Sequence, residues 1–562
     1  MQSCLSFAGA AIRSGESPVA GIPAGTLSVR AADLQVRSSR SVSVTGAAPS
    51  KGEMTGFFRP VVAAPAFVKR DGTVLADAWL PDLVRLGELE AHLGDGTIEA
   101  IAEKAVRAGR LRPRERRRLM SYPLVIRLLI AMTLLPGSCY AEAMRTLAGL
   151  LADIPFTLDW HVPTGKTVTE WRLLIPAEIM EEIFLQAAGP LIGDDEPSAV
   201  MLAGMPVNAA DGMLVNVADT RENREYFGTT GTGDGSSPFP QARIVALTAR
   251  AGHAILAAAI GKASEGEQTL LKNLASERPE LFAHRVTCFD RNFPGYDLII
   301  AILLAKGHVI ARVKAGIALP FGGGPGRGWL PDGSRVSWLN APSGKKEDRL
   351  PVRVTEHSAL VAGPDGQEVS ETCTLLTTFL DDRAVPAGQI TEAYLTRWSA
   401  SETTFGEDKA TIAGAGNRTS GPVLRSGCPQ LVLQEAWAWL AGTQLIRASE
   451  AATLRSEAAA ARALRRKNAK PVTADEESFT AAWRQAVRSL ETTQVTATSS
   501  LAAIAAAQDS AARAHLHTLS LPGRDRHSPR VQKGRPKFGH TSATKQTVTG
   551  KYQVIVYAPG RC

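Results

Sequence analysis

The chain has 562 residues, 44% of them hydrophobic, and its 63 Lys and Arg outnumber its 55 Asp and Glu to give a formal net charge of +8. This length predicts several folded domains, and the positive charge favours a polyanionic partner. The six cysteines form no C-x-x-C pair, which disfavours a zinc site or a disulfide framework and fits a reducing compartment. We expect no membrane span, because the best apolar run, residues 122–135, is too short and contains Arg127.

The N-terminal portion divides into two regions. Residues 1–75 are rich in Ser, Gly, Ala and Pro, a composition typical of a disordered arm, or of a start codon assigned too far upstream. Residues 76–195 show apolar side chains at helical spacing and predict a helical DNA-binding domain, with a weakly indicated helix-turn-helix over 163–190. The arginine-rich run at 107–118 is either a solvated face or a set of contacts to DNA phosphates, which supply most non-specific affinity.

From residue 196 the pattern changes to apolar strands separated by turn residues and helices. One strand-like run surrounds Asp211, and another ends immediately before Asp290. This order predicts an α/β fold with an RNase H-like core, in which the first aspartate lies on the first strand and the second follows the fourth. A Gly- and Pro-rich stretch with short alternating strands predicts a β-subdomain inserted into this core.

After the insertion the core is expected to resume, with a helix over 389–411 that carries Glu402. The predicted domains are a disordered arm (1–75), the helical N-terminal domain (76–195), the first segment of the RNase H-like core (196–313), the inserted β-subdomain (314–373), the second segment of the core (374–450), and an Ala-rich helical region with a basic tail (451–562).

Three acidic residues from distant regions of the chain suggest a catalytic metal site: Asp211, Asp290 and Glu402. Mg²⁺ prefers hard oxygen ligands, and two such ions can serve phosphodiester chemistry by acting on both the attacking and the leaving oxygen. Asp219 is an alternative first carboxylate, but we favour Asp211 because it lies inside the strand-like run. Asp-Gly is also a common turn dipeptide, and Asp290 also suits a helix N-cap, so neither aspartate is by itself evidence of a metal site.

Several blocks of this sequence, taken together and in order over residues 75–450, resemble the DDE transposases of the insertion-sequence-four type. The blocks are Asp211-Gly212 with Asp219 to Asn223 and Phe227-Gly228, then Asp290-Arg291 to Tyr296, then Tyr394/Arg397/Glu402/Lys409 as the Tyr-Arg-Glu-Lys signature, and finally Leu424-Arg425-Ser426 through Gln434-Glu435.

The resemblance implies cut-and-paste movement of a mobile element in the cytoplasm of a bacterium, at the nucleoid. Asp211, Asp290 and Glu402 would be the catalytic residues and would hold two Mg²⁺ or Mn²⁺ ions. The partners would be DNA, as terminal inverted repeats and as target, and a second copy of the chain in a homodimeric synaptic complex. No G-x-x-x-x-G-K-[ST] segment occurs, so no nucleotide cofactor is expected.

The same resemblance assigns DNA contacts to Tyr394, Arg397 and Lys409, and Arg291 of the second block is assigned to DNA as well. An aromatic residue of the insertion, Trp329 or Trp338, is a candidate to stack on an extruded base, although each also suits a structural role.

The signature departs from the family in its spacing. One additional residue separates Arg397 from Glu402, and Ser401 stands at the usual glutamate position. On a helix, Glu402 and Lys409 lie within about 20° of each other, whereas the additional residue rotates Arg397 by about 100°. Either a π-bulge absorbs the insertion or the enzyme is weakened. Glu402 remains the favoured ligand because its spacing to Phe405 and Lys409 is intact.

Three other functions stay open. The chain could be a catalytically degenerate transposase copy that binds DNA ends without cutting, as the altered spacing suggests. It could be a DNA-binding regulator that uses its basic N-terminal region and a non-catalytic core. An RNA phosphodiester hydrolase is disfavoured, because the ordered blocks and the insertion resemble those of transposases.

Overall fold

The computed structural model divides the chain after Ala63, and every residue it describes lies in the second unit. The described residues are 67–68, 74–75, 84–94, 96–113, 120–149, 162–188, 201–231, 237–249, 253–314, 317, 319–320, 328–362, 368–395, 423–465, 479–492, 501–517, 526–527, 548–549 and 552–556. Two short antiparallel strands, β1 (Phe67–Val68) and β2 (Val74–Leu75), lie in the segment for which the sequence predicted disorder.

A bundle of helices forms the N-terminal region. Its members are the 3-10 helix η2 (Gly87–His92), α3 (Thr97–Arg107), α4 (Tyr122–Leu134), α5 (Tyr140–Gly149), α6 (Gly165–Arg172) and α7 (Ala177–Ala188). Hydroxyl side chains cap two of these helices, since Ser121 accepts from the first turn of α4 and Thr164 from that of α6. Arg127, which interrupts the apolar run of α4, is fully buried and pairs with Glu90 and Glu99.

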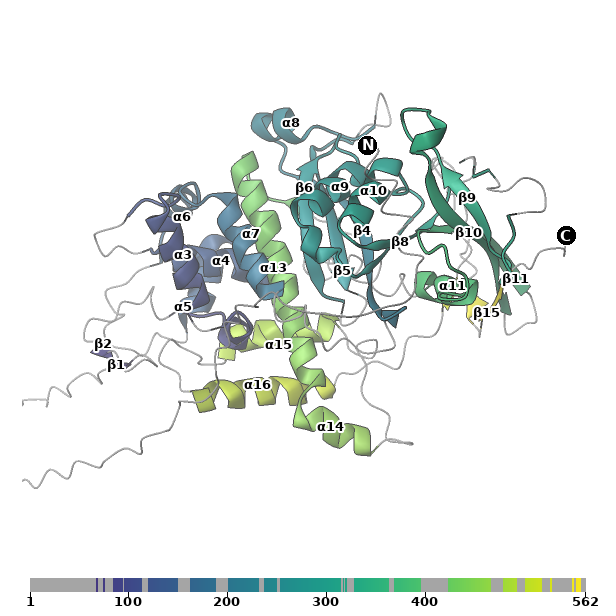
Figure 1. Cartoon of the computed structure of the whole chain (residues 1–562). Coiled ribbons are helices and arrows are strands. Elements are labelled where there is room, and N and C mark those ends of the chain that lie inside the picture. The colour runs from purple at the N-terminus through teal and green to yellow at the C-terminus, as the bar shows by residue number, and fades with distance from the viewer. Residues whose placement is uncertain are drawn as a thin grey trace, which may run out of the picture. The chain divides into compact units, whose positions relative to one another are not determined.

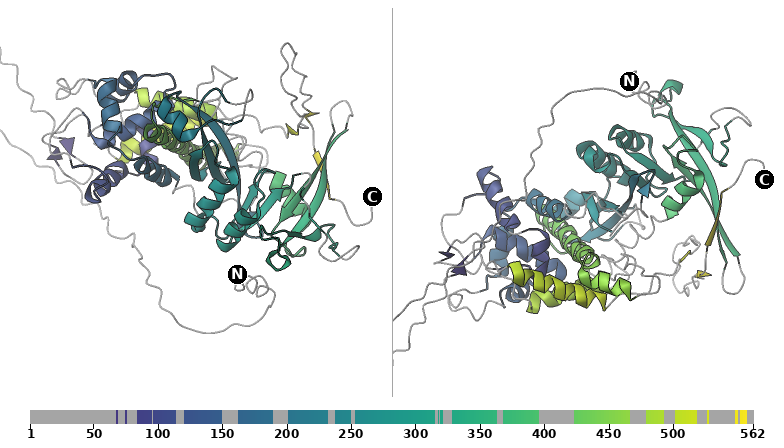
Figure 2. Two further views of the ribbon diagram at one scale, coloured as in Figure 1. Left: turned by 90° about the horizontal axis from the view of Figure 1, so that it is seen from above. Right: turned by 60° about the horizontal axis from the view of Figure 1, so that its bottom comes forward.

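Helices from the C-terminal region complete this bundle. They are α13 (Pro429–Leu454), α14 (Glu457–Leu464), α15 (Phe479–Thr492) and α16 (Leu501–Leu516). α13 is the longest helix that the structure describes, with 26 residues, and it packs against α4 and α7 as well as against α15 and α16 (Figures 1 and 2). No helix in the described ranges is both long and apolar enough to cross a membrane.

The central element is a mixed sheet of 11 strands within the described residues. Its core strands are β4 (Met205–Val217), β5 (Gln241–Ala249), β6 (Ile255–Lys262), β7 (Val286–Phe289) and β8 (His308–Arg312). β4, β5 and β6 pair antiparallel, whereas β7 pairs parallel with β4 and β8 parallel with β7. The resulting order β6-β5-β4-β7-β8 is that of an RNase H-like fold, which confirms the predicted fold class.

Strands from the predicted insertion continue this sheet. They are β9 (Arg335–Leu339), β10 (Leu350–Ala362) and β11 (Glu368–Thr377), joined at the edge by β15 (Tyr552–Val556). β11 pairs with β8, β10 with β11, and both β9 and β15 with β10, all antiparallel (Figure 1). The short strands β3 (Met201–Leu202) and β12 (Val423–Leu424) pair with β4.

Different helices cover the two faces of the sheet. The helices concerned are α9 (Glu267–Glu277), α10 (Tyr296–Leu304) and α11 (Ala387–Leu395). α9 and α10 share an apolar core with Val245 and Phe289 on one face. α11 packs on the other face, where Ile390 and Tyr394 share a core with Cys288. Because side chains alternate along a strand, these two cores fix the face to which each residue of β4 and β7 belongs.

Candidate active site

The two predicted aspartates lie at two neighbouring strands, Asp211 within β4 and Asp290 immediately after the end of β7. β4 and β7 run parallel, and their last paired residues are Ala210 and Phe289. Asp211 and Asp290 each follow the last pair by one position. By strand alternation Asp211 belongs to the face on which α11 packs. Both side chains are partly exposed, and Asp211 Oδ1 accepts the backbone N–H of Gly212 at 2.8 Å.

Asp219, the alternative first carboxylate, occupies a different environment. It lies beyond the end of β4 and is paired with Arg224, whose hydrogen bond lowers the pKa of the Asp219 carboxyl. The structure therefore brings Asp211, and not Asp219, beside Asp290.

The remaining signature residues divide between described and undescribed regions of the chain. Arg397, Ser401, Glu402 and Lys409 lie within residues 396–422, outside the described residues. Tyr394 lies in the last turn of α11 and is only 2% exposed, because its ring belongs to the core between that helix and the sheet. A contact from Tyr394 to DNA would require its hydroxyl to reach the protein surface from this buried position.

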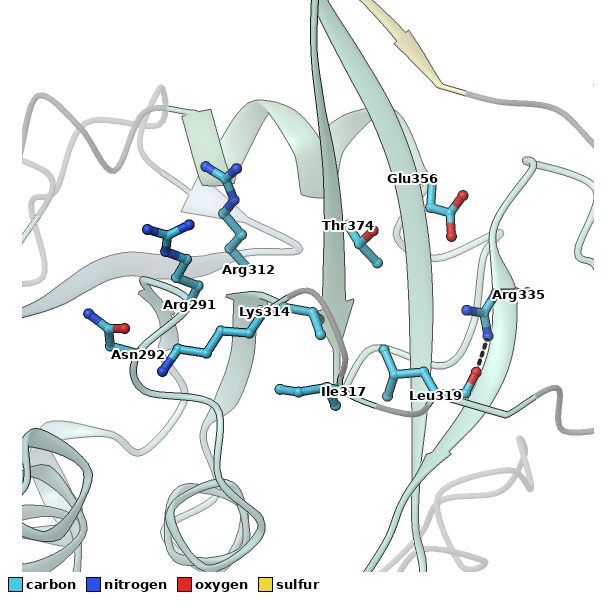
Figure 3. A pocket seen from close by; sticks show the side chains of 10 residues that line it. Arg291, Asn292, Arg312, Lys314, Ile317, Leu319, Arg335, Glu356 and Thr374 are labelled. Atoms are coloured by element: carbon cyan, nitrogen blue, oxygen red, sulfur yellow. Dashed lines mark hydrogen bonds between the residues drawn. The ribbon is translucent and has the colours of Figure 1, made fainter. Parts of the chain in front are cut away.

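A basic cavity of about 740 Å³ is lined in part by Arg291 and Asn292, the two residues that follow the second aspartate in the sequence (Figure 3). Four cationic side chains and one acidic side chain are among its lining residues: Arg291, Arg312, Lys314, Arg335 and Glu356. These residues come from the loop after β7, from the end of β8 and from the strands β9 and β10, so the cavity joins the core to the predicted insertion.

One cation of this cavity is fixed by the surrounding chain. Arg335 Nη1 donates to the carbonyl of Leu319 at 2.9 Å, and burial lowers the pKa of Arg335 while the Glu356 charge opposes that shift. Lys314 and Arg291 are exposed. The predicted Trp329 is 36% exposed and Trp338 is partly buried on β9.

Sequence reasoning predicted Arg291 but missed Arg312 and Lys314. The available signal was their position at the end of the strand over 308–313, since that strand follows the one that leads into Asp290 and ends at the same edge of a parallel sheet.

Sequence reasoning also missed an acidic residue close to the aspartates. Glu267, at the start of α9, forms an ion pair with Arg243 on β5 at 2.9 Å. Burial raises the pKa of Glu267, Arg243 lowers it, and the charges of Asp211 and Asp290 raise it further. The negative charges of Asp211 and Asp290 therefore oppose ionisation of the Glu267 carboxyl.

The donor set fits a hard divalent cation. Asp211 and Asp290 offer carboxylate oxygens, the ligands that Mg²⁺ and Mn²⁺ prefer. No group of three His, Cys, Asp or Glu side chains within the described ranges is placed to hold a metal ion. Glu402, the predicted third ligand, lies outside the described residues.

Two known proteins are similar to this chain, one in sequence and one in structure. The chain is 26% identical over 256 residues to the transposase InsG for insertion sequence element IS4 of Escherichia coli (strain K12). The match takes in 43% of this chain and 52% of InsG, so the chain spans about half the length of this relative. A solved piggyBac transposase synaptic complex with hairpin DNA is 10% identical, with a TM-score of 0.37, over 72% of this chain and 80% of that one. No protein-family model matches the chain.

Proposed function

Because the chain is related to the DDE transposases of the insertion-sequence-four type, we propose that it cuts DNA at the inverted-repeat ends of a mobile element and joins the freed end to target DNA. The observation that carries this proposal is the position of Asp211 and Asp290, one step beyond the last pair of two neighbouring parallel strands. Two carboxylates so placed can share a divalent cation, as in metal-dependent phosphodiester cleavage.

In this proposal Asp211, Asp290 and Glu402 hold two Mg²⁺ or Mn²⁺ ions. When bound, the ions would activate the attacking oxygen and stabilise the leaving oxygen of the phosphodiester. In the first step a water oxygen attacks phosphorus at the element's end and the 3′ oxygen leaves. In the second step the freed 3′-hydroxyl attacks a phosphodiester of the target DNA.

The DNA would lie across the two aspartates and the basic cavity. Arg291 is exposed immediately after Asp290, where its guanidinium is available to a phosphate. Arg397 and Lys409, with Tyr394, are proposed as further DNA contacts. A homodimeric synaptic complex on paired DNA ends, in the bacterial cytoplasm, completes the proposal.

A second function is favoured by one specific observation. The additional residue between Arg397 and Glu402 shifts the first half of the signature relative to the second. A copy in which this shift prevents assembly of the site would bind DNA ends without cutting them and would act as a regulator.

The test is cleavage of a labelled duplex carrying the flanking inverted repeat, with Mg²⁺ or Mn²⁺, by the full chain and its variants. Asp211→Asn, Asp290→Asn and Glu402→Gln are each expected to reduce cutting by at least about 10³-fold, since removal of a group essential to catalysis costs several kcal/mol. Asp219→Asn is the matched control and is expected to cut normally, because Asp219 is paired with Arg224 away from the site.

The outcomes separate the two functions. Cation-dependent cutting that the three site variants lose supports the transposase. Repeat binding without cutting, in the wild type as in the variants, supports the degenerate copy. Loss of cutting in Asp219→Asn with retention in Asp211→Asn would refute the assignment of the first carboxylate.

A further inference from the structure

Two segments that carry the resemblance to transposases, residues 219–223 and 424–435, have no role in the site described above, and the structure brings them into contact. The first ends at Asn223 on α8 (Arg221–Phe227), a helix that packs against α13 (Figure 1). Asn223 Nδ2 donates to the carbonyl of Ser426 at 3.0 Å. The two segments, distant in the sequence, therefore meet at Ser426, just before α13 begins.

Every polar group of Ser426 is engaged by a neighbouring helix. Its N–H donates to Glu435 Oε2 of α13 at 2.9 Å, and its hydroxyl donates to the same oxygen at 2.6 Å. The hydroxyl also accepts from Nη2 of Arg172, on α6, at 3.1 Å, while the carbonyl accepts from Asn223 on α8. Ser426 is only 7% exposed, so a shift of this serine would leave buried polar groups unsatisfied. We call these four residues the Ser426 clamp.

The residues that hold Ser426 are themselves fixed by the surrounding chain. Arg172 is 3% exposed and also donates to the carbonyl of Leu431, in the first turn of α13, at 2.9 Å. Asn223 is fully buried, and its Nδ2 also donates to the carbonyl of Ala218 at 3.0 Å. The clamp thus joins a helix of the N-terminal bundle, a helix of the core and α13 at one serine.

The clamp anchors the chain to the strand that carries the first aspartate. β12, at the start of this segment, pairs parallel with β4 at Asn216 and Val217. The N–H of Ala218 then donates to the carbonyl of Leu424 at 2.9 Å. Since Asp211 lies on the same strand β4, the chain is fixed at this point in one register relative to Asp211.

The chain that enters the clamp comes from the segment that contains Glu402. Residues 396–422 lie outside the described residues, and the described chain resumes with β12. Before this segment, α11 packs on the sheet through Ile390 and Tyr394, in the same core as Val207 of β4. Both described flanks of residues 396–422 are therefore attached either to β4 or to a core that β4 shares.

We propose that the Ser426 clamp positions the chain returning from Glu402 in register with Asp211. Its residues act through Ser426 and touch neither the DNA nor the cations. This role rests on the proposed function, in which Glu402 and Asp211 hold the same pair of cations. It also accounts for two segments of the resemblance that the catalytic residues leave unexplained.

The expected effect follows from the precision that a cation site needs. Carboxylates that share a cation must be placed to within about 0.5 Å. A displacement of about 1 Å costs about 10²-fold in the rate of a reaction that depends on positioning. A loosened clamp should therefore slow cutting at saturating DNA. The affinity for DNA should stay nearly unchanged, because Arg172, Asn223 and Ser426 are buried.

The experiment uses the full chain and a labelled duplex carrying the flanking inverted repeat. Ser426→Ala removes the hydroxyl that Arg172 and Glu435 share. Glu435→Gln exchanges one acceptor oxygen for a donor without a change of size. Each variant is expected to cut saturating DNA about 10- to 100-fold more slowly with Mg²⁺. Its Kd for the duplex, measured without divalent cations, is expected to stay within about 3-fold of wild type.

Hydrogen exchange of a peptide covering residues 396–422, measured without DNA or cations, gives a second readout that does not depend on cutting. Exchange there is expected to be faster in both variants, because one anchored end of the segment is released. Gln430→Ala is the matched control, since Gln430 Nε2 donates to the carbonyls of Leu173 and Ile175 and so tethers α13 to the end of α6 outside the clamp. The control is expected to match wild type in cutting rate, Kd and exchange.

Slower cutting and faster exchange in both clamp variants, with unchanged Kd and a normal control, support the proposed positioning role. Normal cutting and normal exchange in both variants overturn it, and the proposed function then stands because the wild type still cuts. An equal loss of DNA affinity, or the same effects in Gln430→Ala, also overturns the positioning role, because either result shows a general loss of structure.

A wild type that binds the repeat without cutting it would instead overturn the proposed function. Exchange alone then tests the anchoring of residues 396–422. Faster exchange in both clamp variants than in Gln430→Ala supports the anchoring, and equal exchange in all three overturns it.

Discussion

Replacement of Asp332 by Ala is expected to loosen the start of α11, the helix that leads toward Glu402. Asp332 Oδ2 accepts the backbone N–H of Ala387 at 2.8 Å and lies 3.6 Å from Nη2 of Arg353. Arg353 is fully buried on β10, and its Nη2 also donates to the carbonyl of Val385. The two side chains therefore hold the segment in which α11 begins against the strands of the predicted insertion.

The expected loss of stability follows from these contacts. Loss of a side-chain acceptor at a helix start costs about 1 kcal/mol. Removal of one partner from a buried ion pair costs about 3–5 kcal/mol, and the lower end applies here because Asp332 is 16% exposed and the pair is long. We expect the free energy of unfolding to fall by about 3–4 kcal/mol for Asp332→Ala. Asp332→Asn retains an acceptor for the Ala387 N–H and is expected to lose about half as much.

The carboxyl of Asp332 also predicts a pH dependence. Burial raises its pKa, but hydrogen bonds from Ser334 and Ala387 and the charge of Arg353 lower it overall. A carboxyl whose pKa is lowered by folding stabilises the fold fully at pH values above its pKa in the unfolded chain, 3.8. This stabilisation is lost as the pH falls through the lower pKa that the carboxyl has in the folded chain. The stability difference between wild type and Asp332→Asn should therefore shrink in acid.

Urea unfolding of the full chain measures the loss of stability, and hydrogen exchange of a peptide covering residues 385–395 locates it. Asp348→Ala is the matched control, because the Asp348 carboxylate accepts from Ser343 in an exposed turn of the same sheet. The control is expected to change stability by less than about 0.5 kcal/mol. Unchanged exchange at 385–395 in Asp332→Ala, or a loss no larger than that of the control, would refute the reasoning.

Three further predictions concern other regions of the molecule. Arg127→Met removes one of the two arginines that pair with the buried Glu90 carboxylate, while Arg85 stays at 3.4 Å. The free energy of urea unfolding is therefore expected to fall by about 3 kcal/mol, and a loss below about 1 kcal/mol would contradict a structural role. Burial lowers the pKa of His308, so as the pH falls the unfolded chain takes up a proton at this residue before the folded chain does. The stability of the fold should therefore decrease as the pH drops through 6.5, the unfolded value. Thermal melts across this range should show a smaller decrease for His308→Asn. The double variant Arg312→Ala/Lys314→Ala is expected to bind DNA with a weaker salt dependence. The slope of log DNA affinity against log salt concentration should fall in magnitude by about 0.9 for each phosphate that the variant no longer neutralises. An unchanged slope would show that the basic cavity does not contact DNA.

The portion of the site that lies on regular strands could be predicted from the sequence. The apolar runs around Asp211 and before Asp290 contain mostly buried residues, and such runs give strands whose ends are visible in the residue pattern. The strand order of an RNase H-like fold then predicts that the two strands are neighbours in the sheet, as the structure shows for β4 and β7.

The contacts between distant segments could not be predicted in the same way. Nothing in the local pattern around Gly212 shows that the side chain of Glu267, more than fifty residues later, needs the space above it. Similarly, Arg127 breaks an apolar helix in the sequence, and only the fold reveals the carboxylates that compensate its charge. Such requirements come from packing between elements, and a single sequence shows the residue without the neighbour that explains it.

The course of α13 bears on how this chain folds during synthesis. The apolar core of the N-terminal helices includes Val432, Trp437 and Leu445 of α13 and Phe479 of α15, which are made several hundred residues after α3 and α4. Contacts between such distant segments slow folding and leave apolar surface exposed until the later segment emerges. The N-terminal helices would therefore complete their packing only after most of the chain has left the ribosome, and a fragment that ends before α13 would expose the surface which that helix normally covers.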